Sequence, residues 1–306
     1  MDNIYDLLII GSGPAGLTAA IYAARAELNF AVLERSSVSG GQVLTTYEVD
    51  NYPGIPGVSG ADLSNKMREH CDRLGVSFIN EEVRTIARDG REFTLTTWDG
   101  STYTARSIIA ATGAAHRELG CPGEAELAGM GVSYCATCDG AFFKNRKCAV
   151  VGGGDVALED AIYLSGIARQ VYLIHRRSEF RATPALVSQA REIGNIEFIT
   201  DTTVESIEGT DMVESLVLRN KTNDEVSNLA VNGVFIAVGI SPENEIIRSL
   251  ASCNEAGYII AGEDCATSCP GLYVAGDLRA KPLRQIITAA ADGANAVTSV
   301  QKYLRQ

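Results

Sequence analysis

Two cysteines separated by two residues, Cys135 and Cys138, are the clearest candidates for chemistry in this sequence. A pair at this spacing can close a small disulfide ring, and a helix beginning at this point would favour the thiolate form. Asp139 follows directly and could exchange a proton with a sulfur during thiol–disulfide exchange. The motif therefore predicts a redox-active centre made of Cys135, Cys138 and Asp139.

Zinc binding is the alternative interpretation of a close cysteine pair. A structural zinc site needs about four ligands, and the only other close pair in the sequence is Cys265 with Cys269. With three histidines in the chain, we expect no metal. The remaining cysteines are predicted to pack as small apolar residues, although a second disulfide between Cys265 and Cys269 stays open.

Two glycine-rich loops must position this chemistry, and each lies between a strand-like run and a helix-like run. The first, Gly11–Gly16, follows the apolar run Tyr5–Ile10. Its glycines allow a tight turn, the approach of a pyrophosphate to the backbone, and close packing of the helix on the strand. Glu34 stands where the acid that binds a ribose hydroxyl is expected. This loop predicts dinucleotide binding.

The second loop, Gly152–Ala157, follows the run Lys147–Val151 and ends in alanine, which the fingerprint permits. Its next strand is followed by His175-Arg176-Arg177 and then Arg181, instead of an acid. Guanidinium groups at this place favour the 2′-phosphate of NADPH, whereas an acid favours the 2′-hydroxyl of NAD. A solvated basic loop is the alternative. We expect NADPH here, with His175 against either the adenine or the phosphate.

The repeated loop indicates an internal duplication. Later strands that end in small residues, Ile108–Gly113 and Val234–Gly239, complete each unit, and the strand before Gly276-Asp277 must join one of the two sheets. The pattern predicts an α/β protein with two Rossmann-like dinucleotide-binding domains, the second inserted into the first.

Domain boundaries follow from this arrangement. We place the first, discontinuous domain at residues 1–116 and 246–306, and the inserted domain, which carries the cysteine pair, at residues 117–245. The chain is expected to cross between them near Cys121–Gly123 and Ser241-Pro242, because crossings of this composition are common hinges.

The charge and hydropathy of the chain exclude several classes of partner. The 306 residues carry a net charge of −12, which argues against binding to nucleic acid or anionic membranes. The acidic N-terminus does not resemble a signal peptide, and no run approaches the length of a membrane span. We expect a cytoplasmic protein.

Taken together, these residues closely resemble the low-molecular-weight, bacterial-type thioredoxin reductases of the class II pyridine nucleotide-disulfide oxidoreductase family. The resemblance extends over essentially the entire chain and depends on the order and spacing of its motifs. The matching stretches are Gly11–Gly16, Ser39–Gln42, Asn51–Gly54, Ala111–Gly113, Cys135–Gly140, Gly152–Ala157, His175–Arg181, Gly276-Asp277 and Arg284-Gln285.

The resemblance implies FAD in the discontinuous domain, NADPH in the inserted domain, and a homodimer. It implies that electrons pass from NADPH through FAD and the Cys135–Cys138 disulfide to the disulfide of thioredoxin or a thioredoxin-like small protein, with rotation of the inserted domain between steps. Cys138 is expected to be the cysteine nearer the flavin. Phe142-Phe143 resemble an aromatic docking patch for the partner, with ordinary core packing as the alternative.

The resemblance and the two loops together give the expected binding residues. Those for the flavin are Gly11, Ser12, Gly13, Pro14, Ala15, Gly16, Glu34, Arg35, Gly41, Gln42, Asn51, Thr112, Gly113, Gly276, Asp277, Arg284, Gln285 and Ile286. Those for the nicotinamide nucleotide are Gly152, Gly153, Gly154, Asp155, Val156, His175, Arg176, Arg177 and Arg181.

Three stretches depart from the family pattern. Met130 stands where family members commonly have an arginine associated with partner docking, so a glutaredoxin-like protein or a peroxidase carrier stays open as the partner. Val156 replaces a serine or threonine, and losing one hydrogen bond to the cofactor would cost about 0.5–1.5 kcal/mol. Ile240–Glu243 differs from the usual Pro-Asn-Thr ending.

Other functions on the same fold stay open as alternatives. Dithiol oxidases and ferredoxin-dependent disulfide reductases tend to lack the NADPH motif, so the presence of Gly152–Ala157 and His175–Arg181 argues against both. A non-catalytic flavin or zinc redox sensor would be a different class, which metal analysis would distinguish.

Overall fold

The computed structural model describes residues 4–46 and 48–306. Contacts within the backbone divide the chain into two compact units. The first unit comprises Met1–Leu44, Tyr52–Ala115 and Ser241–Gln306, and the second comprises Thr45–Asn51 and His116–Ile240. Most of the second unit is therefore one continuous segment inserted into the first.

The first unit is built on a five-stranded sheet in which every pair of neighbouring strands is parallel. Its strands are short apolar runs, because a parallel sheet is covered on both faces. Ile9 lies in register between Val32 and Ile109. From edge to edge the strands are β18 (Leu272–Val274), β7 (Ile108–Ala110), β1 (Leu7–Ile10), β2 (Phe30–Leu33) and β3 (Phe78–Ile79).

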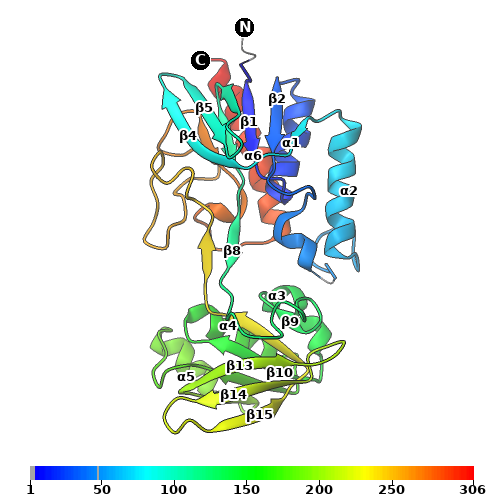
Figure 1. Ribbon diagram of the computed structural model, residues 1–306, viewed down its shortest axis with the longest axis vertical. Helices are drawn as coiled ribbons and strands as arrows, with labels where there is room; N and C mark the ends of the chain where they lie inside the picture. Colours follow the sequence, from blue (N-terminus) through cyan, green and yellow to red (C-terminus); the bar gives the residue numbers. More distant parts are fainter. Residues whose placement is uncertain (1–3, 47) are drawn as a thin grey trace. The chain divides into compact units, whose positions relative to one another are not determined.

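The two faces of this sheet contact different layers, which are visible in Figure 1. Ile9 packs among helices, whereas Ile10 packs toward an antiparallel sheet. Two of the helices approach closely, because a Cβ atom on Gly293 would lie 2.2 Å from the carbonyl oxygen of Ala15. The helices are α1 (Pro14–Arg25), α2 (Gly60–Arg73) and α6 (Ile286–Leu304), and the antiparallel strands are β4 (Val83–Asp89), β5 (Glu92–Thr97) and β6 (Thr102–Ala105).

The second unit repeats this plan. Its parallel sheet has the strand order β12 (Ile196–Ile199), β11 (Gln170–Ile174), β10 (Lys147–Gly152), β16 (Gly233–Ala237) and β9 (Val132–Ser133). Val150 faces a core shared with helices, whereas Ala149 and Val151 face an antiparallel sheet. The helices are α3 (Ala136–Asp139), α4 (Asp155–Ser165) and α5 (Pro184–Glu192), and the antiparallel strands are β13 (Thr202–Glu208), β14 (Ser215–Asn220) and β15 (Val226–Ala230).

The connections complete the predicted topology. The C-terminal strand β18 pairs in parallel with β7, so the strand before Gly276 joins the first sheet. The two crossings between the units, β8 (Ala114–His116) and β17 (Ile240–Pro242), pair with each other as a two-stranded sheet. The predicted fold class, with two Rossmann-like domains and the second inserted into the first, is confirmed. No helix within residues 4–46 and 48–306 has the length and apolar character needed to cross a membrane.

Candidate active site

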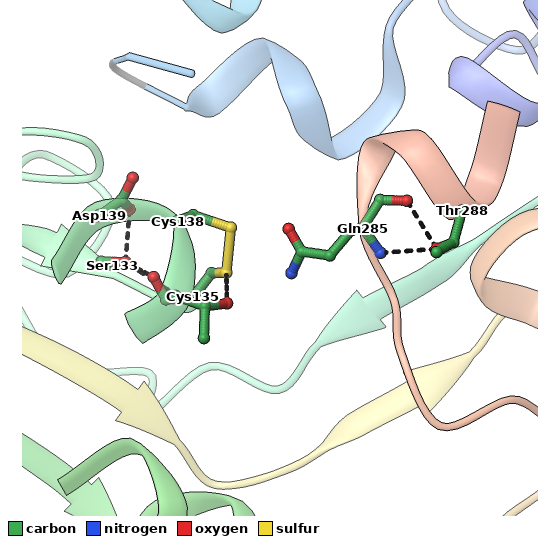
Figure 2. The surroundings of a disulfide bond; sticks show 7 residues. Ser133, Cys135, Cys138, Asp139, Gln285 and Thr288 are labelled. Atoms are coloured by element: carbon green, nitrogen blue, oxygen red, sulfur yellow. Dashed lines mark hydrogen bonds between the residues drawn. A yellow bond between two sulfur atoms is a disulfide. The ribbon is translucent and has the colours of Figure 1, made fainter. Parts of the chain in front are cut away.

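The cysteine pair lies at the one-turn helix α3, which Cys135 precedes as its N-cap residue. Cys135 and Cys138 form a disulfide, with their Cα atoms 5.3 Å apart (Figure 2). The carbonyl oxygen of Cys135 accepts hydrogen bonds from the N–H groups of Cys138 at 3.2 Å and Asp139 at 3.1 Å. The single helical turn therefore brings the two sulfurs to bonding distance, as the spacing predicts.

Helix α3 is anchored on helix α4 of the same unit. Gly140, which follows α3, leaves little space, because a Cβ atom there would lie 3.0 Å from Leu164 and 3.1 Å from Tyr163. The N-terminus of α4 is the second glycine loop. The redox pair and the second glycine loop are therefore both positioned by helix α4.

Asp139, the predicted acid or base, is held by a serine that precedes the motif. The Ser133 hydroxyl donates to Asp139 Oδ2 at 2.6 Å (Figure 2). Burial raises the pKa of the Asp139 carboxyl, and the hydrogen bond from Ser133 opposes that rise. The other oxygen, Oδ1, is buried and has no hydrogen-bond partner among the described residues. A carboxyl with a raised pKa and a free oxygen is suited to accept and release a proton.

The first glycine loop has the geometry that a bound pyrophosphate needs. Gly11 has a φ of +97°, and a Cβ atom there would lie 2.5 Å from the carbonyl oxygen of Ala111. Gly16 lets α1 pack on the loop, since its Cβ would lie 1.9 Å from the oxygen of Gly11. A Cβ on Gly13 would meet only the oxygen of Gly40, at 3.9 Å. No side chain among the described residues caps the N-terminus of α1, so its N–H groups are available to an anion.

Glu34, the acid that follows β2, is hydrogen-bonded to the first glycine loop. Both the N–H and the hydroxyl of Ser12 donate to Glu34 Oε2, each at 2.7 Å. The next residue, Arg35, forms an ion pair of 3.1 Å with Glu243, whose carbonyl oxygen accepts from the Thr112 hydroxyl at 2.6 Å. Glu34 follows β2 and Thr112 follows β7, so the two residues lie beyond the carboxyl ends of the strands on either side of β1, where a dinucleotide binds in this fold.

Asp277 lies in the 3-10 turn Gly276–Leu278 that follows β18. Its Oδ1 is buried without a hydrogen-bond partner in the described chain, and Lys281 Nζ is 3.9 Å away. Burial raises the pKa of the Asp277 carboxyl, against the lowering effects of Lys281 and Arg284. A buried oxygen without a donor fits a hydroxyl-bearing ligand such as the ribityl chain of a flavin.

The other residues predicted for the flavin are distributed around these groups, with one exception. The Gln42 side-chain amide donates to the carbonyl oxygen of Ala114. At the start of α6, the backbone N–H of Gln285 donates to the Thr288 hydroxyl at 3.1 Å. Asn51 instead belongs to the segment Thr45–Asn51 of the second unit. The remaining first-unit positions, in loops or at helix starts, are Pro14, Gly41, Gly113, Arg284 and Ile286.

The second glycine loop is equally crowded on its inner side. A Cβ atom on Gly152 would lie 2.4 Å from the oxygen of Ala237, and one on Gly153 would lie 2.2 Å from His175 Cε1. A Cβ on Gly154 would meet no atom of the described residues within 4 Å. In the described part of the chain no side chain caps α4, whose first residue, Asp155, accepts instead from the N–H of Thr183 at 2.7 Å. The open side of this loop is free for phosphate.

His175 lies beneath this loop rather than on the open side. Its side chain is 5% exposed and stacks on Phe180, with ring centroids 5.0 Å apart. Its Nε2 is 3.1 Å from the carbonyl oxygen of Glu179. Burial lowers the pKa of this imidazole, which favours the neutral ring. The structure thus gives His175 a supporting position behind Gly153.

The three arginines that follow β11 are exposed. None of Arg176, Arg177 and Arg181 forms an ion pair with an acid of the described residues. The backbone N–H of Arg181 donates to the Gly153 oxygen at 2.7 Å, which brings this arginine to the glycine loop. Val156, which lacks the hydroxyl usual in the family, is 54% exposed at the same place. The arginines form an unneutralised cationic group beside the loop.

The docking-patch expectation is wrong for Phe143, where the core-packing alternative is confirmed, and it stays a prediction for Phe142. Phe143 is 5% exposed and contacts Phe235 edge-to-face with ring centroids 5.2 Å apart, so it is a core residue. Only the half-buried Phe142 keeps some accessible surface.

The other cysteines are free thiols. Cys265 and Cys269 do not form a disulfide and lie in different core clusters. Cys71 and Cys148 are buried among apolar side chains, as predicted. Within the described part of the chain, no group of three or more histidines, cysteines or acids is arranged to hold a metal ion.

The sequence motifs do not predict a role for Ser133, Lys281 or Asp292. Asp292 of α6 is 3% exposed, and Lys281 Nζ lies 2.9 Å from its Oδ2. Each is an ordinary residue outside a recognised motif, and their importance comes from burial and long-range contacts. An acid among the alanines of α6 was the one available signal, since such a position is otherwise apolar.

The chain matches a known protein family over most of its length. The model for the pyridine nucleotide-disulphide oxidoreductase family matches residues 5–293. A thioredoxin reductase from Listeria innocua is 46% identical over 100% of this chain and 95% of its own length. The chain belongs to this family.

Within the family it belongs with the thioredoxin reductases, which confirms the resemblance inferred from the motifs. The crystal structure of thioredoxin reductase from Streptococcus pyogenes matches with a TM-score of 0.95 and 43% identity, covering 100% of this chain and 99% of the other. A bifunctional thioredoxin reductase/thioredoxin from Mycobacterium leprae is 43% identical over 100% of this chain and 67% of its own length.

Proposed function

We propose that this protein is a thioredoxin-disulfide reductase. It transfers electrons from NADPH, through FAD and the Cys135–Cys138 disulfide, to the disulfide of thioredoxin or a thioredoxin-like protein. The observation that carries the proposal is the disulfide at helix α3, formed in the unit that also bears the second glycine loop. Membership of the thioredoxin reductase family supports it.

The residues of the first unit suit FAD. The uncapped N-terminus of α1 and the open side of Gly13 would hold the pyrophosphate. Glu34 would hold the ribose, and Asp277 Oδ1, which has no donor in the described chain, would accept a hydroxyl of the ribityl chain. When bound, the flavin supplies a carrier for an electron pair.

The residues of the second unit suit NADPH. Gly154 and the N-terminus of α4 would hold the pyrophosphate. The exposed Arg176, Arg177 and Arg181 would bind the 2′-phosphate, because guanidinium groups bind phosphate with charge-assisted hydrogen bonds. His175 would act indirectly, by supporting Gly153.

The dithiol then carries out the exchange with the partner. One thiolate of the reduced pair attacks the disulfide of the partner, so that a mixed disulfide forms and one partner thiol leaves. The second thiolate attacks the mixed disulfide, which restores Cys135–Cys138 and releases the second partner thiol. The pair loses two electrons and two protons, and the partner gains both. Asp139 is suited to exchange one of these protons, because burial raises its pKa.

Thioredoxin is favoured as the partner by one relative. The Mycobacterium leprae protein is named as both thioredoxin reductase and thioredoxin, and this chain matches 67% of it. The substitution at Met130, which is 41% exposed, keeps other small disulfide proteins open as partners. The homodimer and the cytoplasmic location stay predictions from the resemblance and the composition.

The deciding experiment is anaerobic reduction of the purified flavoprotein. NADPH should bleach the flavin absorbance rapidly, NADH slowly, and oxidised thioredoxin should then restore the colour. Cys138→Ser should abolish transfer to thioredoxin, whereas Cys253→Ser, at a half-buried free thiol, should keep it. If NADPH leaves the flavin oxidised while a dithiol reduces it, electrons run in the oxidase direction and the proposal is wrong.

A further inference from the structure

The hydroxyl of Ser133 joins the two ends of the redox helix. It donates to Asp139 Oδ2 at 2.6 Å and accepts from the backbone N–H of Cys135 at 3.1 Å (Figure 2). The carbonyl oxygen of Cys135 lies farther away, at 3.4 Å. Because a hydroxyl has one proton, that proton belongs to the closer, charge-assisted bond to the carboxylate.

Neither of these bonds involves a sulfur atom. The Cys135–Cys138 disulfide constrains the helix only while it is oxidised, and the ring opens in each catalytic cycle. The Ser133 bonds use a backbone N–H and a carboxylate, so they are equally available to the reduced protein. Ser133 is itself fixed, since it is 5% exposed and lies in β9, paired with Phe235 of β16.

We propose that Ser133 is a positioning residue for dithiol–disulfide exchange, whose hydroxyl keeps Asp139 and the backbone of Cys135 in place when the disulfide is open. This inference rests on the acid/base role proposed for Asp139. It assigns Ser133 no contact with substrate.

The Ser133 hydroxyl affects the pKa of the buried Asp139 carboxyl. Burial raises the pKa of the Asp139 carboxyl, and the hydrogen bond from Ser133 lowers it. The hydroxyl stabilises the charged carboxylate, so its removal should raise the pKa further. Asp139 Oδ1 has no hydrogen-bond partner in the described chain and stays available for the proton.

The test compares four variants in the intact flavoprotein. Ser133→Ala deletes the hydroxyl. Ser133→Thr keeps the hydroxyl, whereas Ser133→Val lacks it, and the two new side chains have nearly the same volume. Comparing this pair therefore separates the effect of the hydrogen bond from the effect of packing. Ser165→Ala is the control, because Ser165 is a half-buried serine whose hydroxyl also donates a 2.6 Å hydrogen bond, to the carbonyl oxygen of Ile162.

The first readout is the rate at which oxidised thioredoxin re-oxidises the reduced enzyme, measured as a function of pH. The variant Asp139→Asn shows which limb of this pH profile belongs to the titration of Asp139. Ser133→Ala and Ser133→Val should move that limb to higher pH by about one unit. Ser133→Thr and Ser165→Ala should keep the wild-type profile. If Thr and Val give the same profile, or if Ala superimposes on the wild type, Ser133 is merely structural.

A second readout does not depend on turnover. Protein labelled with ¹³C-aspartate reports the titration of the Asp139 carboxyl directly, in both oxidised and reduced protein, with Asp139→Asn as the assignment. The pKa should rise in Ser133→Val relative to Ser133→Thr in both redox states, and no rise would overturn the inference. If the pKa rises but Asp139→Asn leaves the pH profile unchanged, the acid/base role of Asp139 fails instead.

Discussion

Lys281 Nζ lies 2.9 Å from Asp292 Oδ2, and each of the two side chains keeps only 4% of its surface exposed. The same carboxylate accepts from Arg279 at 2.8 Å and from the backbone N–H of Gly276 at 3.0 Å. Asp292 thereby joins helix α6 to the turn that carries Asp277. This buried charge network holds the proposed flavin-binding carboxylate in place.

The network predicts a large effect of Asp292→Asn on stability. The substitution removes the carboxylate that Arg279 and Lys281 share and leaves Lys281 only the more distant Asp277, at 3.9 Å. Breaking a buried ion pair in this way typically costs about 3–5 kcal/mol of the free energy of unfolding. Urea unfolding of the apoprotein measures it. Glu205→Gln, at the solvent-exposed ion pair with Arg219, should cost much less because water screens that pair. Equal losses in the two variants would contradict a special role for Asp292.

The arginines after β11 predict the choice of nucleotide. Arg176→Ala and Arg177→Ala should each lower kcat/KM for NADPH by about 10–100-fold, because each removes a charge-assisted bond to the 2′-phosphate. Activity with NADH should change little. Arg169→Ala is the control, since this exposed arginine lies at the opposite end of the same strand. An equal loss of kcat/KM with NADPH and with NADH would show that the arginines do not bind the 2′-phosphate.

Gly153 and Gly154 should differ in their tolerance of alanine. A Cβ on Gly153 would overlap the buried His175 ring at 2.2 Å, whereas a Cβ on Gly154 would meet no atom of the described chain within 4 Å. Gly153→Ala should therefore lower the unfolding free energy by about 1–3 kcal/mol, and Gly154→Ala should not. Thermal unfolding without nucleotide measures this, since any effect of Gly154→Ala on phosphate binding is then absent. Similar stability of the two variants would disprove the packing role of His175.

His175 also predicts a loss of stability in acid. Burial is the largest cause that lowers the pKa of folded His175 below 6.5, the value expected in the unfolded chain. At a pH between the folded and the unfolded pKa, the unfolded chain therefore binds more protons than the folded protein. Stability should thus fall as the pH drops below about 6.5, and stop falling from this cause below the folded pKa. His175→Gln should flatten part of this slope in unfolding measurements between pH 5 and pH 8, chosen as roughly the range in which histidine titrates. An unchanged slope would assign the acid sensitivity elsewhere, such as to His116, whose pKa burial also lowers.

Much of this protein was predictable from local pattern. The Cys135–Cys138 spacing corresponds to one helical turn, so the possibility of a disulfide is contained in the motif itself. The loops at Gly11 and Gly152 are equally local, because a strand, a tight turn and a helix N-terminus are adjacent in sequence. The resemblance to thioredoxin reductases follows from the same short stretches.

The tertiary structure determines which side chains that are distant in sequence contact one another. His175 and Phe143 were recognised by their place in motifs, yet burial under Gly153 and against Phe235 gives them packing roles. Ser133 and Asp292 belong to no motif, and their partners are fixed by neighbouring strands and by the close approach of α6 to the Gly276 turn. Spacing along the chain determines local turns, whereas burial and long-range hydrogen bonds depend on how the elements pack, which no short pattern contains.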